Sequence, residues 1–187
     1  MVCWLGMETL VIVATIAQGV AISLGVGTST IAIVSFFGAI ADGTIDKTER
    51  YMLGFIYYVL RVAMVIIMLT MLALFSAEAI TTGTITLTTA SVSTILLVCT
   101  LYANAILMTM RVMPSTVGPA LQAATWYTLG TMASLNSLGL VTFGIIPFFL
   151  GYVSIILLAI ALVNSVMAIM KQRRQLTQPT PPPPTTP

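Results

Sequence analysis

The feature that most restricts the fold of this chain is a series of long apolar segments that carry almost no charge. From Thr9 to Ala41 the sequence contains no charged residue, and a helix of that length extends about 50 Å. The hydrocarbon core of a bilayer is roughly 30 Å thick, so this segment is long enough to cross it. Only 6% of the 187 residues are charged and 58% are hydrophobic, whereas soluble domains contain about 25% charged residues. This composition excludes a soluble globular enzyme, a disordered chain and a coiled coil, and it indicates a polytopic membrane protein.

The apolar segments predict an all-α protein, a transmembrane bundle of five helices. Residues 1–8 are expected to form an external N-terminus. Residues 171–187 are expected to form a disordered tail, which is basic at first and then rich in proline. Asp46 and Glu49 have the spacing of a helix N-cap and its N3 acid, so Asp46 is expected to cap the second helix. The expected helices cover about 9–41, 47–79, 88–112, 119–141 and 147–170.

The basic residues predict the orientation of this bundle. With five spans, all of the seven Lys and Arg residues except Arg61 fall on one side of the membrane. Loops rich in Lys and Arg face the cytoplasm, so we expect the N-terminus outside and the C-terminus inside. The residues on the predicted cytoplasmic side are Lys47, Arg50, Arg111, Lys171, Arg173 and Arg174.

Arg61 is the charged residue within a predicted span. It lies about 16 Å further along the helix than Arg50, and Glu78 of the same helix is about 25 Å away, too far to pair with it. A charge at the centre of a span costs about 2.5–3.5 kcal/mol. Two interpretations stay open: an arginine that snorkels or binds carbonyl groups and fixes packing, or a binding site for an anion or a lipid headgroup.

Four polar residues are expected to lie near Arg61. Counted from the basic end of each predicted helix, Tyr57, Tyr58, Asn104 and Asn164 have similar depths, about one turn from Arg61. A buried side-chain amide needs a hydrogen-bond partner in hydrocarbon. We therefore predict a polar layer of these residues as a candidate binding site, or alternatively as contacts that only hold the helices together.

Ala17, Ala21, Gly25 and Ser29 recur every four residues on the first predicted helix. Such a stripe of small residues allows another helix to approach closely. It predicts packing either within the chain or against a partner, which would be a second copy or another membrane protein. The lipid bilayer is the other expected partner, and no nucleic-acid partner is expected.

The sequence gives no reason to expect an enzyme, a cofactor or a metal site. It has no histidine and only two cysteines, Cys3 and Cys99, which removes histidine-ligated haem and the usual general base. Met64, Met68 and Met71 lie on one face of the second predicted helix, and thioethers can bind copper(I). Flexible apolar packing is the favoured interpretation of these methionines.

The sequence resembles small bacterial polytopic membrane proteins of uncharacterised function and, more distantly, the copper-resistance D type. Those proteins carry a histidine in the first helix where this chain has Gln18, so the resemblance implies no haem or metal site here. It does imply a bacterial inner-membrane location. The residues that carry the resemblance are Ala17–Thr28 (AQGVAISLGVGT), Phe36 and Phe37, Asp42–Glu49 (DGTIDKTE), Asn104, and Met113 with Pro114.

Two functions from different classes are consistent with these features. The first is a non-enzymatic packing or interaction subunit of the inner membrane. The second is a small transporter or channel-like protein with a polar site around Arg61. Because no acidic residue is expected inside the membrane to couple Arg61 to a moving proton or cation, the first function is favoured.

Overall fold

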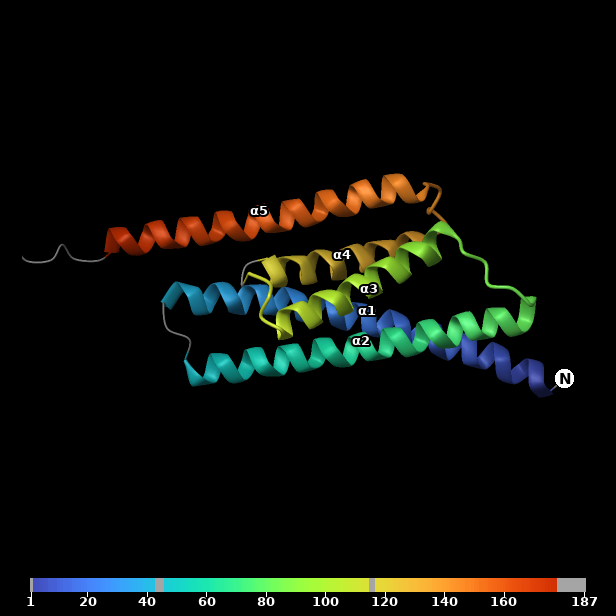
Figure 1. The fold of residues 1–187 in the computed structure, drawn as a ribbon. Helices are drawn as coiled ribbons and strands as arrows, with labels where there is room; N and C mark the ends of the chain where they lie inside the picture. The colour runs from blue at the N-terminus through green and yellow to red at the C-terminus, as the bar shows by residue number, and fades with distance from the viewer. Residues whose placement is uncertain (1, 43–45, 115–116, 178–187) are drawn as a thin grey trace, which may run out of the picture.

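The computed structural model of this protein describes residues 2–42, 46–114 and 117–177 (Figure 1). The described residues form helices and connections with no strand, which confirms the prediction of an all-α protein with five helices. The helices are α1 (Val2–Asp42), α2 (Lys47–Thr82), α3 (Thr89–Thr109), α4 (Val117–Ser137) and α5 (Ile145–Thr177).

Three helix bounds differ from those expected by four residues or more. Helix α1 begins at Val2, so most of the segment expected as an external N-terminus is helical. Helix α4 ends at Ser137, because Gly139 adopts a left-handed φ of 68° and its N–H bonds to the carbonyl of Asn136. Helix α5 continues to Thr177, since the residues that follow Met170 are good helix formers. The proline-rich residues 178–187 lie outside the described part.

Both ends of α2 are fixed by hydrogen bonds. Asp46 caps the helix in a capping box with Glu49, whose side chain accepts a bond from the Asp46 N–H at 3.0 Å, as the sequence predicted. At the other end, Gly83 has a φ of 74° and donates to the carbonyl of Ala79. The Glu78 carboxylate then accepts bonds from the N–H and the hydroxyl of Thr86. These contacts hold the connection between α2 and α3.

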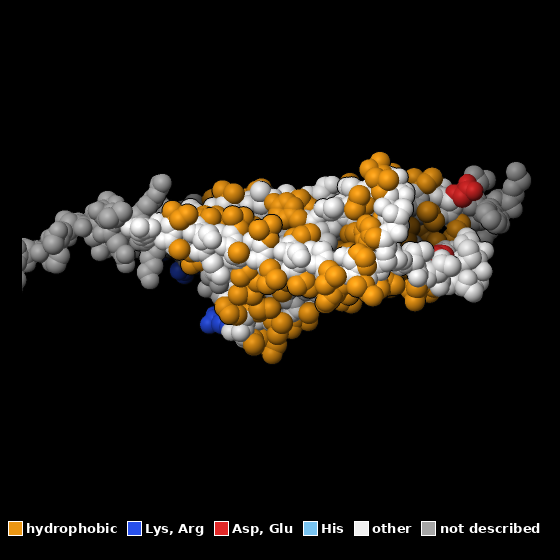
Figure 2. Space-filling model, turned by 90° about the horizontal axis from the view of Figure 1, so that it is seen from above, with side chains coloured by type: hydrophobic (Ala, Val, Ile, Leu, Met, Phe, Trp, Pro, Cys, Tyr) orange, Lys and Arg blue, Asp and Glu red, His pale blue; other side chains and the backbone are white. Residues whose placement is uncertain are grey.

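The helices alternate in direction, which brings the Lys and Arg residues near the helix ends to one end of the bundle, while acidic residues lie at both ends (Figure 1). We call one end of the bundle the basic end. It includes the start of α2 and the connection between α3 and α4, with Lys47, Arg50 and Arg111. The opposite, acidic end includes Glu8 and Glu78. On the face that Figure 2 shows, hydrophobic side chains cover the length between them, with Lys and Arg at one end and Asp and Glu at the other.

Helix α4 is the centre of the bundle. It contacts α1, α3 and α5, while α1 and α2 pack together as a long antiparallel pair (Figure 1). Trp126 and Leu129 of α4 are among the largest fully buried side chains. The buried residues of α4 are Gly118, Ala120, Gln122, Ala123, Ala124, Thr125, Trp126, Thr128, Leu129 and Met132.

Within the part of the chain that the structure describes, four helices are long and apolar enough to cross a membrane: α1 over Gly6–Gly38, α2, α3, and α5 over Ile145–Met170. Helix α4 has the same length as α3, 21 residues or about 31 Å, but it contains fewer isoleucine, leucine and valine residues. Its position explains this difference, because a helix enclosed by other helices does not face lipid along most of its surface.

The remaining helices are longer than the two central ones. Helices α1, α2 and α5 have 41, 36 and 33 residues, and all three extend beyond α3 and α4 at the basic end (Figure 1). Residues counted from the starts and ends of different helices are therefore not at equal heights in the bundle.

Candidate functional site

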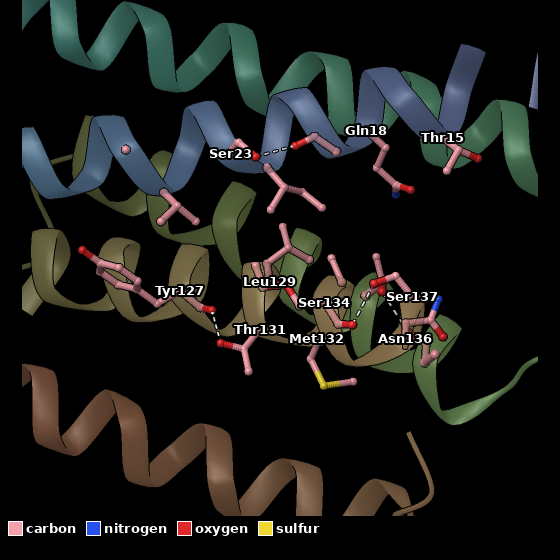
Figure 3. A pocket seen from close by; sticks show the side chains of 18 residues that line it. Thr15, Gln18, Ser23, Tyr127, Leu129, Thr131, Met132, Ser134, Asn136 and Ser137 are labelled. Atoms are coloured by element: carbon pink, nitrogen blue, oxygen red, sulfur yellow. Dashed lines mark hydrogen bonds between the residues drawn. The ribbon is translucent and has the colours of Figure 1, made fainter. Parts of the chain in front are cut away.

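A groove of about 1020 Å³ lies between α1 and α4, with two residues of α3 in its lining (Figure 3). Its lining contains no charged residue. We call it the α1–α4 groove. It is lined by Thr15, Gln18, Gly19, Ile22, Ser23, Val26 and Gly27 of α1, Ala90 and Thr94 of α3, and Tyr127, Leu129, Gly130, Thr131, Met132, Ala133, Ser134, Asn136 and Ser137 of α4.

The serine and threonine hydroxyls of the α1–α4 groove are bonded to their own helices. Ser23 donates to the carbonyl of Gly19 at 2.9 Å, and Thr131 to that of Tyr127 at 2.9 Å (Figure 3). Ser134 donates to the carbonyl of Gly130 at 3.0 Å. Each of these oxygens still has acceptor capacity, so a bound group can use it.

Two amide side chains lie in the same groove. Gln18 is half-buried and points from α1 toward α4, and Asn136 lies exposed near the end of α4 (Figure 3). An amide has two donor hydrogens and a carbonyl oxygen to satisfy. Within the described residues neither side chain has a hydrogen bond to another protein group, so both remain open to a bound partner.

Close packing of α1 on α4 adjoins the groove. Gly25 is buried, and a Cβ there would lie 2.2 Å from the Trp126 ring. Gly130 of α4 also lies close to α1, since a Cβ on Gly130 would be 3.2 Å from the Val26 side chain. The Thr30 and Tyr127 hydroxyls are hydrogen-bonded at 2.6 Å and join the same two helices.

A second polar cluster lies deeper, toward the basic end. Asn104 is 1% exposed, and its amide nitrogen donates to the Gln122 side chain at 2.9 Å and to the Gly118 carbonyl at 3.0 Å. The Gln122 amide reaches the sulfur of Met64 at 3.9 Å. The Asn104 side-chain oxygen has no hydrogen-bond partner. This cluster joins α2, α3 and α4, and it is fully enclosed rather than open to a ligand.

The predicted polar layer is corrected by this arrangement. Asn104 lies level with Met64, about 10 Å along α2 from Tyr57. Tyr58 is 65% exposed and Asn164 is also exposed, so both lie on outer faces of the bundle. Of the amides predicted for this layer, only Asn104 is enclosed, and its partner is Gln122, which sequence reasoning missed. The binding role of these residues stays a prediction.

Arg61 is exposed on the surface of α2 and is not enclosed by the other helices, and both interpretations of this residue stay predictions. It lines neither the α1–α4 groove nor a smaller hollow of about 320 Å³ between α4 and α5, where Phe148 and Tyr152 lie. Beside this smaller hollow, Tyr152 shares a 2.7 Å hydrogen bond with Thr125 of α4.

The small-residue stripe of α1 packs mostly within the chain. Ala21 and Ser29 are 0% and 2% exposed, Gly25 is buried, and Ala17 is half-buried. A partner therefore cannot contact the centre of this stripe, and the predicted partner needs another surface. Gly19 and Gly27, which line the α1–α4 groove, have open space around them.

No protein family, curated protein sequence or solved structure matches this chain.

Proposed function

We propose that this protein is a non-enzymatic interaction subunit of a bacterial inner membrane, and that it binds a transmembrane helix of a partner in the α1–α4 groove. The observation that carries the proposal is the lining of this groove, which combines small residues with uncharged hydroxyl and amide groups. The protein would cross the membrane five times, with α4 in the middle of the bundle.

The distribution of charge supports the proposed orientation. Lys47, Arg50 and Arg111 belong to one end of the bundle, whereas Glu8 and Glu78 belong to the other. Basic residues near the ends of spans are retained in the cytoplasm. The basic end would therefore face the cytoplasm, and the α1–α4 groove would lie in the outer half of the membrane.

The chemistry of the groove favours a helix over an ion as its occupant. Lipid gives two helices no hydrophobic reason to associate, so their contacts depend on close packing and on hydrogen bonds between them. Gly19 and Gly27 allow close approach, and Gln18 and Asn136 provide hydrogen-bonding groups. No charged side chain is available there to bind or repel an ion.

The test is photocrosslinking in native membranes. A benzoylphenylalanine placed at Ser23, which lines the groove, should form an adduct with a transmembrane segment of one membrane protein or of a second copy. The matched control is Leu157 on α5, which is 62% exposed but remote from the groove. Adducts with lipid alone, or the same adducts at both positions, would overturn the proposal.

The alternative function is a small transporter, and a second measurement separates it from the first. A solute pathway needs a groove that contains water, whereas a groove filled by a helix is dry. A cysteine at Thr131, with Cys3 and Cys99 replaced by serine, should resist a membrane-impermeant maleimide in intact cells. A cysteine at Thr142 in the exposed connection before α5 should react. Equal reaction at both positions would favour the transporter.

A further inference from the structure

Arg61 stands on the outer face of α2 beside an exposed tyrosine. Tyr58 lies one turn nearer the basic end on the same face and is 65% exposed. On the other side of Arg61 the face is apolar, with Val62, Val65 and Leu69 at 37%, 50% and 60% exposed. Arg61 and Tyr58 therefore form a short polar segment of this face, with the exposed Phe55 on its basic side.

The height of Arg61 in the bundle follows from two contacts of Met64. The Tyr102 hydroxyl donates to the Met64 carbonyl at 3.1 Å, and the Gln122 amide reaches the Met64 sulfur at 3.9 Å. Gln122 is about 7.5 Å from the start of α4, and Arg61 is about 4.5 Å from Met64 toward the basic end. Arg61 therefore lies only about 3 Å inside the level at which α4 begins.

No acidic side chain that the structure describes is placed to neutralise Arg61. Asp46 and Glu49 are held in the capping box at the start of α2, and Glu8 and Glu78 belong to the opposite end. A second copy with the same orientation would bring its acids to the same heights. The described part of the chain therefore offers Arg61 no carboxylate, within one copy or between copies.

We infer that Arg61 and Tyr58 bind the phosphate of a phospholipid headgroup at the basic end of the bundle. A guanidinium group donates two parallel hydrogen bonds to phosphate oxygens, and the Tyr58 hydroxyl can donate a third. Val62, Val65 and Leu69 would contact the acyl chain of the same lipid. The long arginine side chain reaches the headgroup level from just inside the ends of α3 and α4.

The test is native mass spectrometry of the full chain, purified in detergent and mixed with dioleoylphosphatidylglycerol. Arg61→Gln should lower the bound fraction about five-fold, the amount expected for one basic residue near an anionic surface. Arg61→Lys should keep part of the binding, since a lysine retains the charge without the bidentate geometry. The control is Arg50→Gln, also exposed on α2, which should change the bound fraction less than Arg61→Gln does.

Two further probes test whether binding depends on both the phosphate and the acyl chains. Dioleoylglycerol, which has the same chains without phosphate, should bind equally to the original protein and to Arg61→Gln. Inorganic phosphate should not displace the phospholipid at millimolar concentration. Equal phosphatidylglycerol binding by the original protein and Arg61→Gln would overturn the inference, as would displacement by inorganic phosphate. The site is on a different face from the α1–α4 groove, so this result is independent of the proposed function.

Discussion

Helices α4 and α5 show how the two environments of a membrane bundle select different sequences. Helix α5 is the most apolar of the four candidate spans, yet only 11% of its apolar segment is buried in the bundle. Helix α4 is rich in threonine, serine and amide residues and is enclosed by α1, α3 and α5. In a soluble protein the more apolar helix would be inside. In lipid the apolar helix stays outside, and the polar helix finds its hydrogen bonds within the protein.

The largest expected effect comes from adding one methyl group where α1 meets α4. In Gly25→Ala the new Cβ would lie 2.2 Å from the buried Trp126 ring, so the free energy of unfolding should fall by about 1–3 kcal/mol. Gly27→Ala is the matched control, because nothing lies within 4 Å of its Cβ position. Thermal denaturation in detergent measures both. Similar melting temperatures for the two variants would show that α1 does not pack on α4 as described.

Substitutions of one enclosed and one exposed asparagine compare how much each side chain contributes to stability. Asn104→Leu removes the partner of Gln122 and of the Gly118 carbonyl, so the free energy of unfolding should fall by about 1–3 kcal/mol. Asn164→Leu on the exposed face of α5 should change it by less than about 0.5 kcal/mol. Chemical denaturation of both variants measures the difference, and a larger loss for Asn164→Leu would reverse the comparison.

The attachment of α5 to α4 should respond to a smaller change. Tyr152→Phe removes the 2.7 Å hydrogen bond to Thr125 and keeps the ring, which stacks against Phe148. The expected loss is about 0.5–1.5 kcal/mol. Thr125→Val should cost a similar amount, and the double variant should cost less than the sum of the two. Additive losses would indicate that the two hydroxyls do not interact.

The smallest effect on stability is expected at Arg61. Its side chain is exposed and has no protein acceptor in the described structure, so Arg61→Leu leaves no buried group without a partner. The melting temperature in detergent without added phospholipid should stay level or rise. A fall as large as that of Asn104→Leu would show that Arg61 holds the helices together.

Sequence patterns could predict the number of helices and the cap of α2, because both depend on local features. Apolar length identifies the helices, and the Asp46 and Glu49 pair needs only its own turn. The polar layer depended on relative height, which is a property of the assembled bundle. Counting from basic residues assumed that all helices begin at one level, but α2 extends beyond α3 and α4. Tyr57 was thus placed beside Asn104, although Asn104 lies level with Met64.

Sequence reasoning missed Gln122 and did not identify the groove residues as a site, for a related reason. In the sequence, Gln122 is one polar residue among many in α4, and nothing local distinguishes it from Gln18 or Asn136. Only the packing decides that Gln122 is 7% exposed and bonded to Asn104 while Asn136 is exposed. The available signal was the low content of isoleucine, leucine and valine in α4, since a span with few of these residues is expected to face other helices.

Reporter fusions test most directly whether α4 crosses the membrane at the centre of the bundle. With α4 as a span, alkaline phosphatase fused after Gly139 should be active outside, and a fluorescent protein fused after Arg174 should be bright in the cytoplasm. A fusion after Met113, on the basic side of α4, should also be cytoplasmic. If α4 does not cross, Gly139 remains on the cytoplasmic side and α5 carries Arg174 outside. Phosphatase activity at Arg174 and none at Gly139 would contradict the five-span bundle.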